Sequence, residues 1–458
     1  MKDLHFIGIG GIGMSALAAA AADCKWTVSG SDRGADKIEN AAIFNALKSR
    51  NIKIYPQNGS RFDVSPLPEA LVYSTAIEND NPDFLAAGEI PRLHRSELLR
   101  ILLDEFNRIS IAVTGSCGKS TVTCYLAETL TRLGADPVMI SGALAKHFRT
   151  PQNAGNYRGG NGKYLVFEAD ESDKSLLKYG ADYALILNIG TDHYDKDELA
   201  RVFGEFLARI RKGAVLSGEV YQAVKKYIPA DLPIRVLDFL PQDTLVKYIP
   251  GNGSPAAAYF GDGTKLQLPA PGRHMAENAL FVRALLSMLD FDDRQVMTTL
   301  PDFDGVWRRN DFAGNTAAGA QVFDDYAHNP EKIVSCLAGM RERCRGRIFA
   351  LFQPHGYGPF GFMRDALFEA VDAFLKPDDR FILLEPFYAG GTSSFSPHAD
   401  EVCAGYRKSA AVPEKYLCFA DRKSAGEFLI SHAGKDDLIV IMGARDNSLS
   451  DFARSLTR

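Results

Sequence analysis

The sequence of 458 residues contains few features that mark membrane, secreted or nucleic-acid-binding proteins. It has no apolar stretch approaching the roughly 20 residues that a membrane-spanning helix needs. No long basic run accompanies its formal net charge of −5, which argues against a dedicated nucleic-acid binder. The N-terminus runs directly into an expected strand, without the regions of a signal peptide. We therefore expect a protein that works without a membrane or a nucleic-acid partner.

The cysteines also lack a pattern: seven residues, an odd number, are scattered without CxxC spacing. Such a set predicts free thiols in a reducing compartment, because secreted disulfide frameworks use paired cysteines. With 46% apolar and 24% charged residues, the composition is otherwise that of an ordinary globular protein. A chain of this length is too long for one hydrophobic core, so two or three domains are expected. Together these features predict a cytoplasmic, multidomain α/β protein.

The strongest chemical signal is a glycine-bearing stretch. Residues 109–123, ISIAVTGSCGKSTVT, predict a buried strand, a tight turn and the start of a helix. Such a turn directs backbone N–H groups inward, where they cradle phosphate oxygens. Lys119 is placed to reach the terminal phosphates, and the Ser120 hydroxyl to bind Mg²⁺. Because Val113 stands where the usual P-loop has its first glycine, the loop is a shortened version, and an ordinary glycine turn with a surface lysine is the alternative.

A second unit of strand, glycine turn and helix opens the chain. Its glycines form a G-x-G-x-x-G pattern, and Asp32 ends the next expected strand, 27–32. This is the arrangement of a dinucleotide-binding unit, in which the acidic residue holds a ribose hydroxyl. Because any diphosphate suits such a helix N-terminus, NAD is only one candidate. Farther on, residues 92–103 predict a helix that leads into the second domain.

Two later strands end in polar clusters. One strand starts at Tyr164 and ends in four carboxylates within six residues, 168–173. Like charges so close repel one another, and a cation is the natural remedy, although a solvated acidic turn is the alternative. The next strand, 183–190, is followed by TDHYD, which contains His193. Since the carboxyl ends of parallel strands share one edge of a doubly wound sheet, these ends and the glycine turn together predict an ATP–Mg²⁺ site.

With these motifs in order, the chain resembles the Mur ligase family over nearly its whole length. The matching stretches are 5–14, 115–121, 168–173, 188–195, 272–278, 305–309, 324–330, 352–355 and 442–444. The resemblance implies three α/β domains. Residues 1–105 would form a Rossmann-like domain that holds UDP, and residues 106–302 a central P-loop ATPase-type doubly wound sheet. Residues 303–458 would form a Rossmann-like domain that closes on ATP and binds the incoming amino acid.

The resemblance further implies an ATP-dependent, ADP-forming carboxylate–amine ligase, active as a monomer or a homodimer. Its reaction would join an amino acid, with L-alanine as first candidate, to the carboxylate of UDP-N-acetylmuramate in peptidoglycan precursor synthesis. ATP would activate the carboxylate as an acyl phosphate, so positive charge must surround the transferred phosphoryl group. The implied catalytic residues are Lys119, Glu168, His193, His328 and Arg308.

The resemblance also implies three sets of binding residues. The implied Mg²⁺ ligands are Ser120, Glu168 and His193. The implied ATP-binding residues are Gly115, Cys117, Gly118, Lys119, Ser120, Thr121, His274, Asn278, Arg309 and Asp324. The implied binding residues for the UDP-linked substrate are Gly8, Gly10, Gly11, Gly13, Ser31, Asp32, Ser74 and Thr75. For Ser74 and Thr75, simple turn chemistry is an equal alternative.

The chain departs from the family's pattern in three stretches. In the phosphate loop Ser116, Cys117 and Ser120 replace threonine, histidine and threonine, and Asn329 replaces a second histidine. Gly356 follows Gln-Pro-His where the family has an arginine, and the next arginine is Arg364. The family uses arginines of that stretch around the incoming amino acid, and losing a bidentate carboxylate partner is a large change. Another amino acid, a peptide (as in the murein-peptide recycling ligase of the family) or a divergent paralogue's acceptor therefore stays open.

Two interpretations lie outside the ligases. A nicotinamide-dependent dehydrogenase could be built on Gly8 to Asp32, but it leaves the phosphate loop and the acidic cluster without a purpose. A non-catalytic nucleotide-binding regulator would keep the fold and lose the substrate pocket. Gly356 favours the regulator slightly, whereas the intact Lys119, Glu168 and His193 argue against it.

Overall fold

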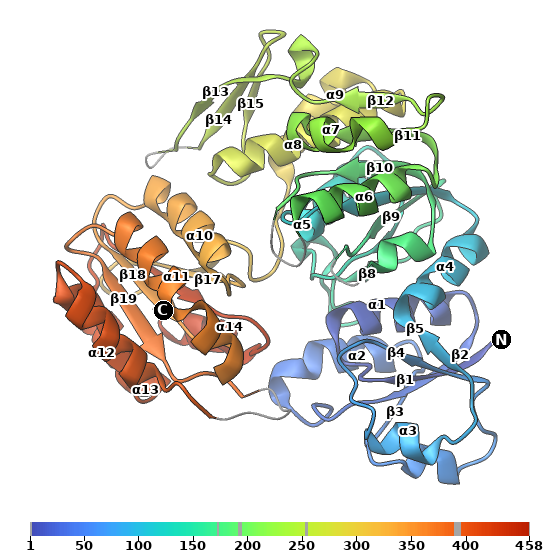
Figure 1. Ribbon diagram of the computed structural model, residues 1–458, viewed down its shortest axis with the longest axis horizontal. Coiled ribbons are helices and arrows are strands. Elements are labelled where there is room, and N and C mark those ends of the chain that lie inside the picture. The colour runs from blue at the N-terminus through green and yellow to red at the C-terminus, as the bar shows by residue number, and fades with distance from the viewer. Residues whose placement is uncertain (1, 172–173, 191–194, 252–254, 389–394, 458) are drawn as a thin grey trace. The chain divides into compact units, whose positions relative to one another are not determined.

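The computed structural model describes residues 2–171, 174–190, 195–251, 255–388 and 395–457 (Figure 1). The chain forms two compact units. Unit 1 comprises residues 1–248, 257–269 and 273–306, and unit 2 comprises 249–256, 270–272 and 307–458. Unit 1 contains two large sheets, whereas unit 2 contains one. The boundaries expected near residues 105 and 302 stay a prediction.

The first sheet of unit 1 is parallel, with strand order β3-β2-β1-β4-β5. Its strands are β1 (Asp3–Ile7), β2 (Thr27–Ser31), β3 (Lys53–Tyr55), β4 (Ala70–Tyr73) and β5 (Arg92–His94). Its helices are α1 (Ile12–Asp23), α2 (Ala41–Lys48), α3 (Pro82–Ala86) and α4 (Arg95–Phe106). The alanine-rich α1 is buried along most of its length, because its small side chains allow close packing on several sides.

The helix expected over 92–103 is wrong at its start. Arg92–His94 forms strand β5, and the helix begins only at Arg95. The reason is a capping box: the His94 side chain accepts a hydrogen bond from the first turn, while Glu97 accepts one from the His94 N–H at 2.9 Å. These reciprocal bonds satisfy donors that a helix start leaves open, so the chain turns helical only after His94.

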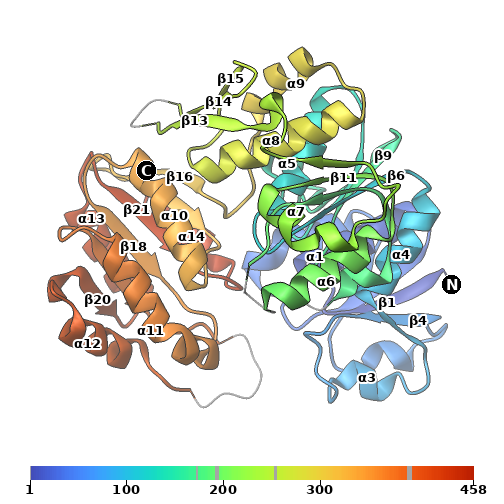
Figure 2. The same ribbon diagram turned by 45° about the horizontal axis from the view of Figure 1, so that its top comes forward.

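The second sheet of unit 1 has seven strands in the order β12-β11-β10-β6-β9-β7-β8, and all neighbours are parallel except β7 and β8. Its strands are β6 (Ile109–Thr114), β7 (Val138–Ile140), β8 (Tyr157–Arg158), β9 (Tyr164–Glu168), β10 (Ala181–Ile186), β11 (Ile210–Leu216) and β12 (Ile234–Val236). Its helices are α5 (Lys119–Arg132), α6 (Lys196–Leu207), α7 (Gly218–Val224), α8 (Arg273–Met288) and α9 (Asp293–Thr299). Helices α5 and α8 lie side by side (Figures 1 and 2). A small sheet of β13 (Leu245–Ile249), β14 (Ala257–Phe260) and β15 (Lys265–Gln267) completes the unit.

Unit 2 is built on a six-stranded sheet of order β16-β17-β21-β18-β19-β20. Within the described part of this sheet, only β16 runs antiparallel to its neighbour. The strands are β16 (Asp311–Asn315), β17 (Gln321–Asp325), β18 (Ile348–Phe352), β19 (Arg380–Leu384), β20 (Tyr416–Phe419) and β21 (Leu438–Met442). The helices are α10 (Pro330–Arg343), α11 (Tyr357–Phe374), α12 (Ala399–Ser409), α13 (Arg422–His432) and α14 (Ser448–Ser455).

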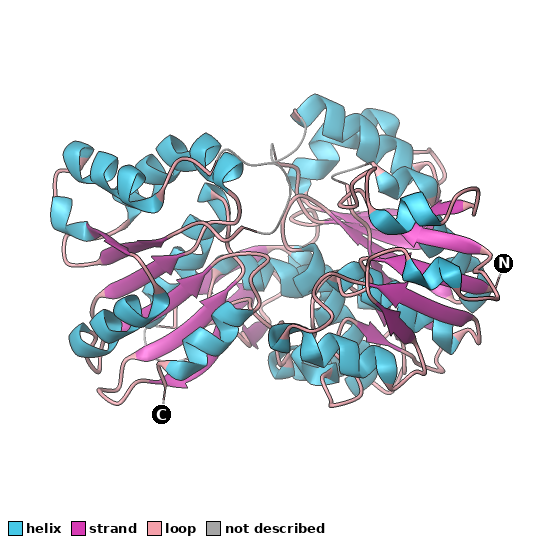
Figure 3. Ribbon diagram, turned by 90° about the horizontal axis from the view of Figure 1, so that it is seen from below, coloured by secondary structure: helices cyan, strands magenta, loops and turns pink. Residues whose placement is uncertain are grey.

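Helices cover both faces of this sheet (Figure 3). Alternate residues of β18 enter two separate apolar clusters: Ala350 and Phe352 pack on one face, Phe349 and Leu351 on the other. A strand buried on both faces must be apolar throughout, which explains its unbroken hydrophobic sequence. The predicted fold class, α/β with doubly wound parallel sheets, is confirmed. No helix within the described ranges combines the length and apolarity needed to cross a membrane.

Candidate functional site

The glycine turn between β6 and α5 adopts the backbone that the sequence predicts for a phosphate loop. Gly115 has φ 135° and Gly118 has φ 87°, values that side chains other than glycine's rarely allow. Gly118 is the N-cap of α5, so the N–H groups of the first helical turn face the loop. A helix start of this kind, with no Cβ in the way, fits an anionic phosphate.

Lys119 is held at this loop by two partners. Its Nζ donates to Gly115 O at 2.8 Å and forms an ion pair with Glu171, 2.8 Å from Oε2. Burial by itself lowers the pKa of Lys119, but the carboxylates of Glu171 and Glu168 outweigh it, so the net pKa is raised. The lysine is therefore a fixed positive charge. The sequence had marked the acidic cluster as a whole, and the structure identifies Glu171 as the member that contacts Lys119.

Asn188 clamps the loop from the next strand end. Its Oδ1 accepts from the Cys117 N–H at 2.8 Å, and its Nδ2 donates to Cys117 O at 2.9 Å. The Ser116 hydroxyl accepts from the N–H of Gly190 at 2.8 Å. These bonds fix the loop to the segment after β10. Sequence reasoning included Asn188 in a motif but gave it no role, because a clamp between adjacent strand ends requires the strand order.

The acidic strand end after β9 is neutralised largely by the protein itself. One oxygen of Glu168 accepts from the Gly142 N–H at 2.9 Å, and Asp170 pairs with Arg95 at 2.8 Å. With Glu171 paired to Lys119, each described carboxylate of this cluster has a partner. The Arg95 ion pair also joins α4 to the second sheet of unit 1. A metal ion is thus not needed to relieve the repulsion that the sequence indicates.

The predicted Mg²⁺ ligands are Ser120, Glu168 and His193, and His193 lies outside the described residues. Ser120 lies in the first turn of α5, and Glu168 ends the adjacent strand β9. A hydroxyl and a carboxylate are oxygen ligands of the kind that Mg²⁺ prefers, so the donor types fit. The three-residue set itself stays a prediction.

One group of metal-ligating side chains does come together within the described ranges, at the other end of α5. It consists of Glu128, His147 and Asp304. Arg132 already pairs with Glu128 at 2.8 Å and with Asp304 at 3.2 Å, which supplies the cation this acidic group needs. The group therefore holds the segment around Asp304 against α5.

Helix α8 brings a predicted ATP-binding residue to the phosphate loop. A Cβ added at Gly118 would lie 3.4 Å from Oδ1 of Asn278. His274 precedes Asn278 by four residues and therefore shares its face of α8. The sequence could not decide between adenine contact and packing for this pair. The structure places Asn278 beside the loop, and the adenine role remains a prediction.

In the first sheet, Asp32 organises the glycine turn before α1. Its two oxygens accept from the N–H groups of Gly10 at 2.8 Å and Gly34 at 2.7 Å. A Cβ on Gly10 would meet Asp32 Oδ2 at 2.9 Å, so only glycine permits this approach. Gly11 is the N-cap of α1, which leaves the first N–H groups of the helix facing the turn.

Ser31 is turned into the domain. Its side chain is fully buried, and its hydroxyl donates to Asp83. Asp83 also accepts from the N–H of Gly59 at 2.7 Å, and His5 lies 3.9 Å from it. Burial tends to raise the pKa of Asp83, but hydrogen bonds from His5, Ser31 and Gly59 lower it overall. The Ser31 hydroxyl is therefore engaged within the domain, and its role in binding the UDP-linked substrate stays a prediction. Asp83 is a residue that sequence reasoning missed.

The remaining predicted residues at this edge, Ser74 and Thr75, follow β4. Ser74 O accepts from the Ile77 N–H at 3.1 Å, which closes a turn, and Thr75 is exposed. The turn alternative raised from the sequence describes this geometry. A role in binding the UDP-linked substrate stays a prediction for both residues.

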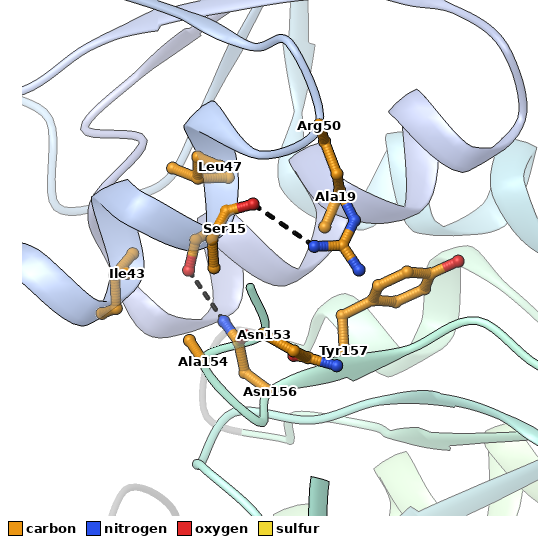
Figure 4. Close-up of a pocket in the computed structure, with 10 residues that line it drawn as sticks. Ser15, Ala19, Ile43, Leu47, Arg50, Asn153, Ala154, Asn156 and Tyr157 are labelled. Atoms are coloured by element: carbon orange, nitrogen blue, oxygen red, sulfur yellow. Dashed lines mark hydrogen bonds between the residues drawn. The ribbon is translucent and has the colours of Figure 1, made fainter. Parts of the chain in front are cut away.

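Helix α1 is also attached to the second sheet. Asn156 Nδ2 donates to Ile12 O at 2.6 Å and to the Ser15 hydroxyl at 2.8 Å (Figure 4). Arg50, which follows the end of α2, donates a hydrogen bond of 3.1 Å to Gln152 O. A small cavity lies among these side chains, lined by residues of α1, α2 and the 153–157 loop. These bonds fix the helix of the first glycine turn to the sheet that carries the phosphate loop.

In unit 2, the adjacent residues Arg308 and Arg309 differ in burial and in their partners. Arg308 is fully buried and pairs with Asp324 at 3.1 Å, and it donates to Gly443 O and Asp446 O. Ser450 also donates to Asp324. Both members of this pair are therefore engaged in the interior of unit 2, and the catalytic role of Arg308 and the ATP contact of Asp324 stay predictions. Arg309 is only partly buried, over the Tyr326 ring at 5.2 Å, and keeps the predicted phosphate role.

Two histidines lie together at the carboxyl edge of this sheet. The rings of His328 and His355 are 5.2 Å apart and nearly perpendicular. His328 Nδ1 lies 2.9 Å from Tyr326 O, so it carries the proton and leaves Nε2 bare. Burial, then the nearby charge of Lys332, lowers the pKa of His328 to about 4. Burial, then Arg445, lowers the pKa of His355 to about 4. Both imidazoles are therefore neutral at neutral pH.

Two of the departures from the family's pattern have local explanations. Asn329 is the N-cap of α10, and its side chain accepts from the Lys332 N–H at 2.9 Å, ahead of Pro330 at the first position. Gly356 has φ 83° and ψ 141°, a conformation that side chains rarely tolerate. An arginine at 356 is thus incompatible with this backbone. For Cys117, the structure shows an exposed thiol in the loop.

Comparison with known proteins agrees with this organisation. Three domain descriptions of one family match the chain in order: "Mur ligase family, catalytic domain" at residues 3–107, "Mur ligase middle domain" at 113–286 and "Mur ligase, glutamate ligase domain" at 308–445. Among curated relatives, the UDP-N-acetylmuramate–L-alanine ligase of Agrobacterium fabrum is 32% identical, over 96% of this chain and 93% of the relative. The enzyme of the same name from Acaryochloris marina is 30% identical, over 97% and 93%.

Solved structures show the same fold. The UDP-N-acetylmuramate–alanine ligase MurC of Thermotoga maritima has a TM-score of 0.79 at 24% identity, covering 100% of this chain and 98% of the other. A murein peptide ligase of Psychrobacter arcticus has a TM-score of 0.70 at 20% identity, with the same coverage. Together, the three domain matches and the near-full-length relatives mean that this chain belongs to the Mur ligase family and is an ATP-dependent, ADP-forming ligase.

Proposed function

We propose that this ligase joins L-alanine to the carboxylate of UDP-N-acetylmuramate, as a step of peptidoglycan precursor synthesis. The observation that carries the proposal is the near-full-length likeness to ligases named for that reaction. Unit 1 supports it, because it combines a glycine turn suited to a diphosphate with a phosphate loop suited to ATP. The cytoplasm is the expected location, in agreement with the seven free cysteines.

The two glycine turns of unit 1 would bind different ligands. The turn held by Asp32 would bind the diphosphate of UDP through the N–H groups of α1. The loop held by Asn188 would bind the phosphates of ATP, with Lys119 as its fixed positive charge. When bound, ATP supplies the phosphoryl group that activates the carboxylate, and Mg²⁺ supplies further positive charge. Ser120 and Glu168 would be the described residues that hold the metal ion.

The residues of unit 2 would serve the incoming amine. His328 offers a bare Nε2 that can accept a hydrogen bond from an ammonium group, because Nδ1 is committed to Tyr326 O. Arg309, partly buried over Tyr326, would supply charge for phosphate. A loss of water around these groups protects an acyl phosphate from hydrolysis.

A peptide acceptor is the second candidate, and Gly356 favours it. Among the described residues, a Cβ at Gly356 would contact Pro359, and one at Gly358 would have no neighbour within 4 Å. Without side chains at these two positions, there would be room for an acceptor bigger than alanine.

The test is phosphate release with ATP, Mg²⁺ and UDP-N-acetylmuramate, screened against L-alanine, glycine, L-serine and a muropeptide. Release that requires both the UDP-sugar acid and L-alanine supports the first candidate. Release only with the muropeptide moves the protein to the recycling function. ATP turnover that ignores both substrates contradicts the proposal.

A further inference from the structure

The loops that follow β18 and β21 run side by side at the carboxyl edge of the unit 2 sheet. The strands are parallel neighbours, with Phe352 opposite Met442 at their last pair. The contact continues beyond the strands, since a Cβ on Gly443 would lie 2.7 Å from Gln353 O. Position 356 therefore lies four residues past the last pair on one loop, and position 445 lies three residues past it on the neighbouring loop.

Position 356 is where the family's pattern has an arginine, and this chain has a glycine whose backbone excludes one. The neighbouring loop carries Arg445. An arginine lost from one loop is thus matched by an arginine on the loop beside it. This exchange keeps a guanidinium at the same edge of the sheet while changing the strand from which it comes.

Arg445 is available to bind a ligand. Its side chain is exposed, and within the described part of the chain its guanidinium makes no ion pair or hydrogen bond. Its backbone is fixed, because its N–H donates to the Tyr326 hydroxyl at 3.2 Å. Its φ of 64° is uncommon for a residue other than glycine, asparagine or aspartate. Backbone conformations of this kind cluster at active sites and ligand-binding segments.

The surroundings of Arg445 suit a zwitterion. The charge of Arg445 acts on His355, whose ring contacts that of His328. These imidazoles are neutral, so each has one nitrogen without a proton. Nδ1 of His355 is buried and has no hydrogen-bond partner among the described residues. A carboxylate matches the guanidinium, and an ammonium matches the bare imidazole nitrogens. Both groups are present on every free amino acid.

We propose that Arg445 binds the carboxylate of the incoming amino acid, in place of the arginine missing at position 356. The inference rests on the proposed function, since it names the residue that recognises the acceptor of that reaction. It also explains how the chain can keep an amino-acid acceptor despite Gly356. Because the carboxylate is recognised rather than the side chain, the proposal applies to alanine and to other small amino acids alike.

The experiment compares L-alanine with L-alaninamide, which keeps the amine and lacks the carboxylate. Wild-type protein is expected to prefer L-alanine strongly. In Arg445→Gln, the loss of a charge-assisted bond should raise the KM for L-alanine about tenfold to a hundredfold and remove most of the preference over the amide. The KM values for ATP and UDP-N-acetylmuramate should not change. Arg454→Gln, an exposed arginine on α14, is the matched control.

A second variant, Arg445→Gly, removes the side chain but suits the positive φ, so it separates loss of the guanidinium from backbone strain. Equal preference for L-alanine over the amide in wild type and both variants overturns the inference and leaves the proposed function standing. Wild-type protein that releases phosphate with no amine at all overturns the proposed function instead. Thermal unfolding of each variant shows that the comparison is made on folded protein.

Discussion

In the turn before α1, the carboxylate of Asp32 accepts hydrogen bonds from Gly10 and Gly34, whereas in the turn before α5 the clamp is the neutral amide of Asn188. The second turn carries a cation within the loop itself, Lys119, which is paired with Glu171. At the first turn the cation comes from α4: Arg95 Nη1 lies 4.0 Å from where a Cβ on Gly13 would be, and Arg95 is paired with Asp170. A negative clamp weakens the positive field that helix N–H groups offer to an anion. A neutral clamp beside a fixed lysine creates a stronger positive field.

The difference separates binding from chemistry. A diphosphate that does not react needs only to be held, and N–H groups at a helix start are sufficient. A phosphoryl group in transfer develops charge that must be stabilised, which requires a cation placed in advance. Two turns of similar sequence pattern thus serve different purposes, and the residues that hold them show which is which.

The sharpest test of this contrast is Lys119→Ala. Removing the fixed charge should lower kcat by about a thousandfold or more, since one preorganised donor is worth about 10²–10³ and this one is a full charge. Binding of UDP-N-acetylmuramate, measured by calorimetry, should be unchanged. Normal ATP turnover in this variant would show that the phosphate loop has been assigned wrongly.

A smaller effect is expected for Asn188→Ala. The substitution removes both hydrogen bonds to Cys117 and leaves the loop less ordered, so the KM for ATP should rise about tenfold to a hundredfold. The UDP-sugar KM should stay constant. Asn161→Ala, at a surface turn of the same sheet, serves as control. Equal KM values for ATP in the two variants would show that Asn188 does not order the loop.

The reciprocal change is Asp32→Asn. An asparagine side chain has one acceptor oxygen, so one of the two bonds to Gly10 and Gly34 is lost. The KM for UDP-N-acetylmuramate should rise about tenfold, with that for ATP unaffected. If instead the KM for ATP changes and the KM for UDP-N-acetylmuramate does not, the ligands of the two turns have been exchanged in this assignment.

The smallest effect concerns stability in acid, and it extends the comparison to unit 2. The pKa of His328 is lowered to about 4 by burial and by Lys332, so between about pH 6.5 and 4 the unfolded chain binds a proton that the folded chain does not. Stability therefore falls as the pH falls through this window. His328→Gln should lose about 1 kcal/mol less than wild type between pH 7 and 5.5 in urea titrations. Parallel plots of unfolding free energy against pH for the two proteins would mean that His328 is protonated in the folded protein as readily as in the unfolded chain.

The sequence was sufficient for the fold class and for both glycine turns, because these depend on local patterns of apolar strands, glycines and helix starts. For Asn278 the sequence showed only that the residue belongs to a motif, and its place beside the phosphate loop came from the structure. The sequence could not show that Glu171, and not Glu168, pairs with Lys119. Four acids within six residues look alike in sequence, and the turn after β9 decides which one faces the lysine.

Arg308 and Arg309 illustrate the same limit. They are adjacent residues of one type, but Arg308 has φ 57° and enters the core, whereas Arg309 stays partly exposed. Ser31 and Asp83 are 52 residues apart, so their bond depends on the packing of the whole first sheet. By contrast, the Asn-Pro start of α10 is readable from sequence, because asparagine and proline are typical of the N-cap and first position.

The bonds from Asn156 to Ile12 and Ser15 bear on how this chain could be recombined with its relatives. A chimera that exchanges only residues 1–105 would pair a foreign α1 with the native 152–157 loop. The donors of Asn156 would then meet an unmatched surface, and an unsatisfied buried amide is costly. The 152–157 segment therefore belongs, for purposes of exchange, with the first hundred residues, even though it lies in the middle of the chain.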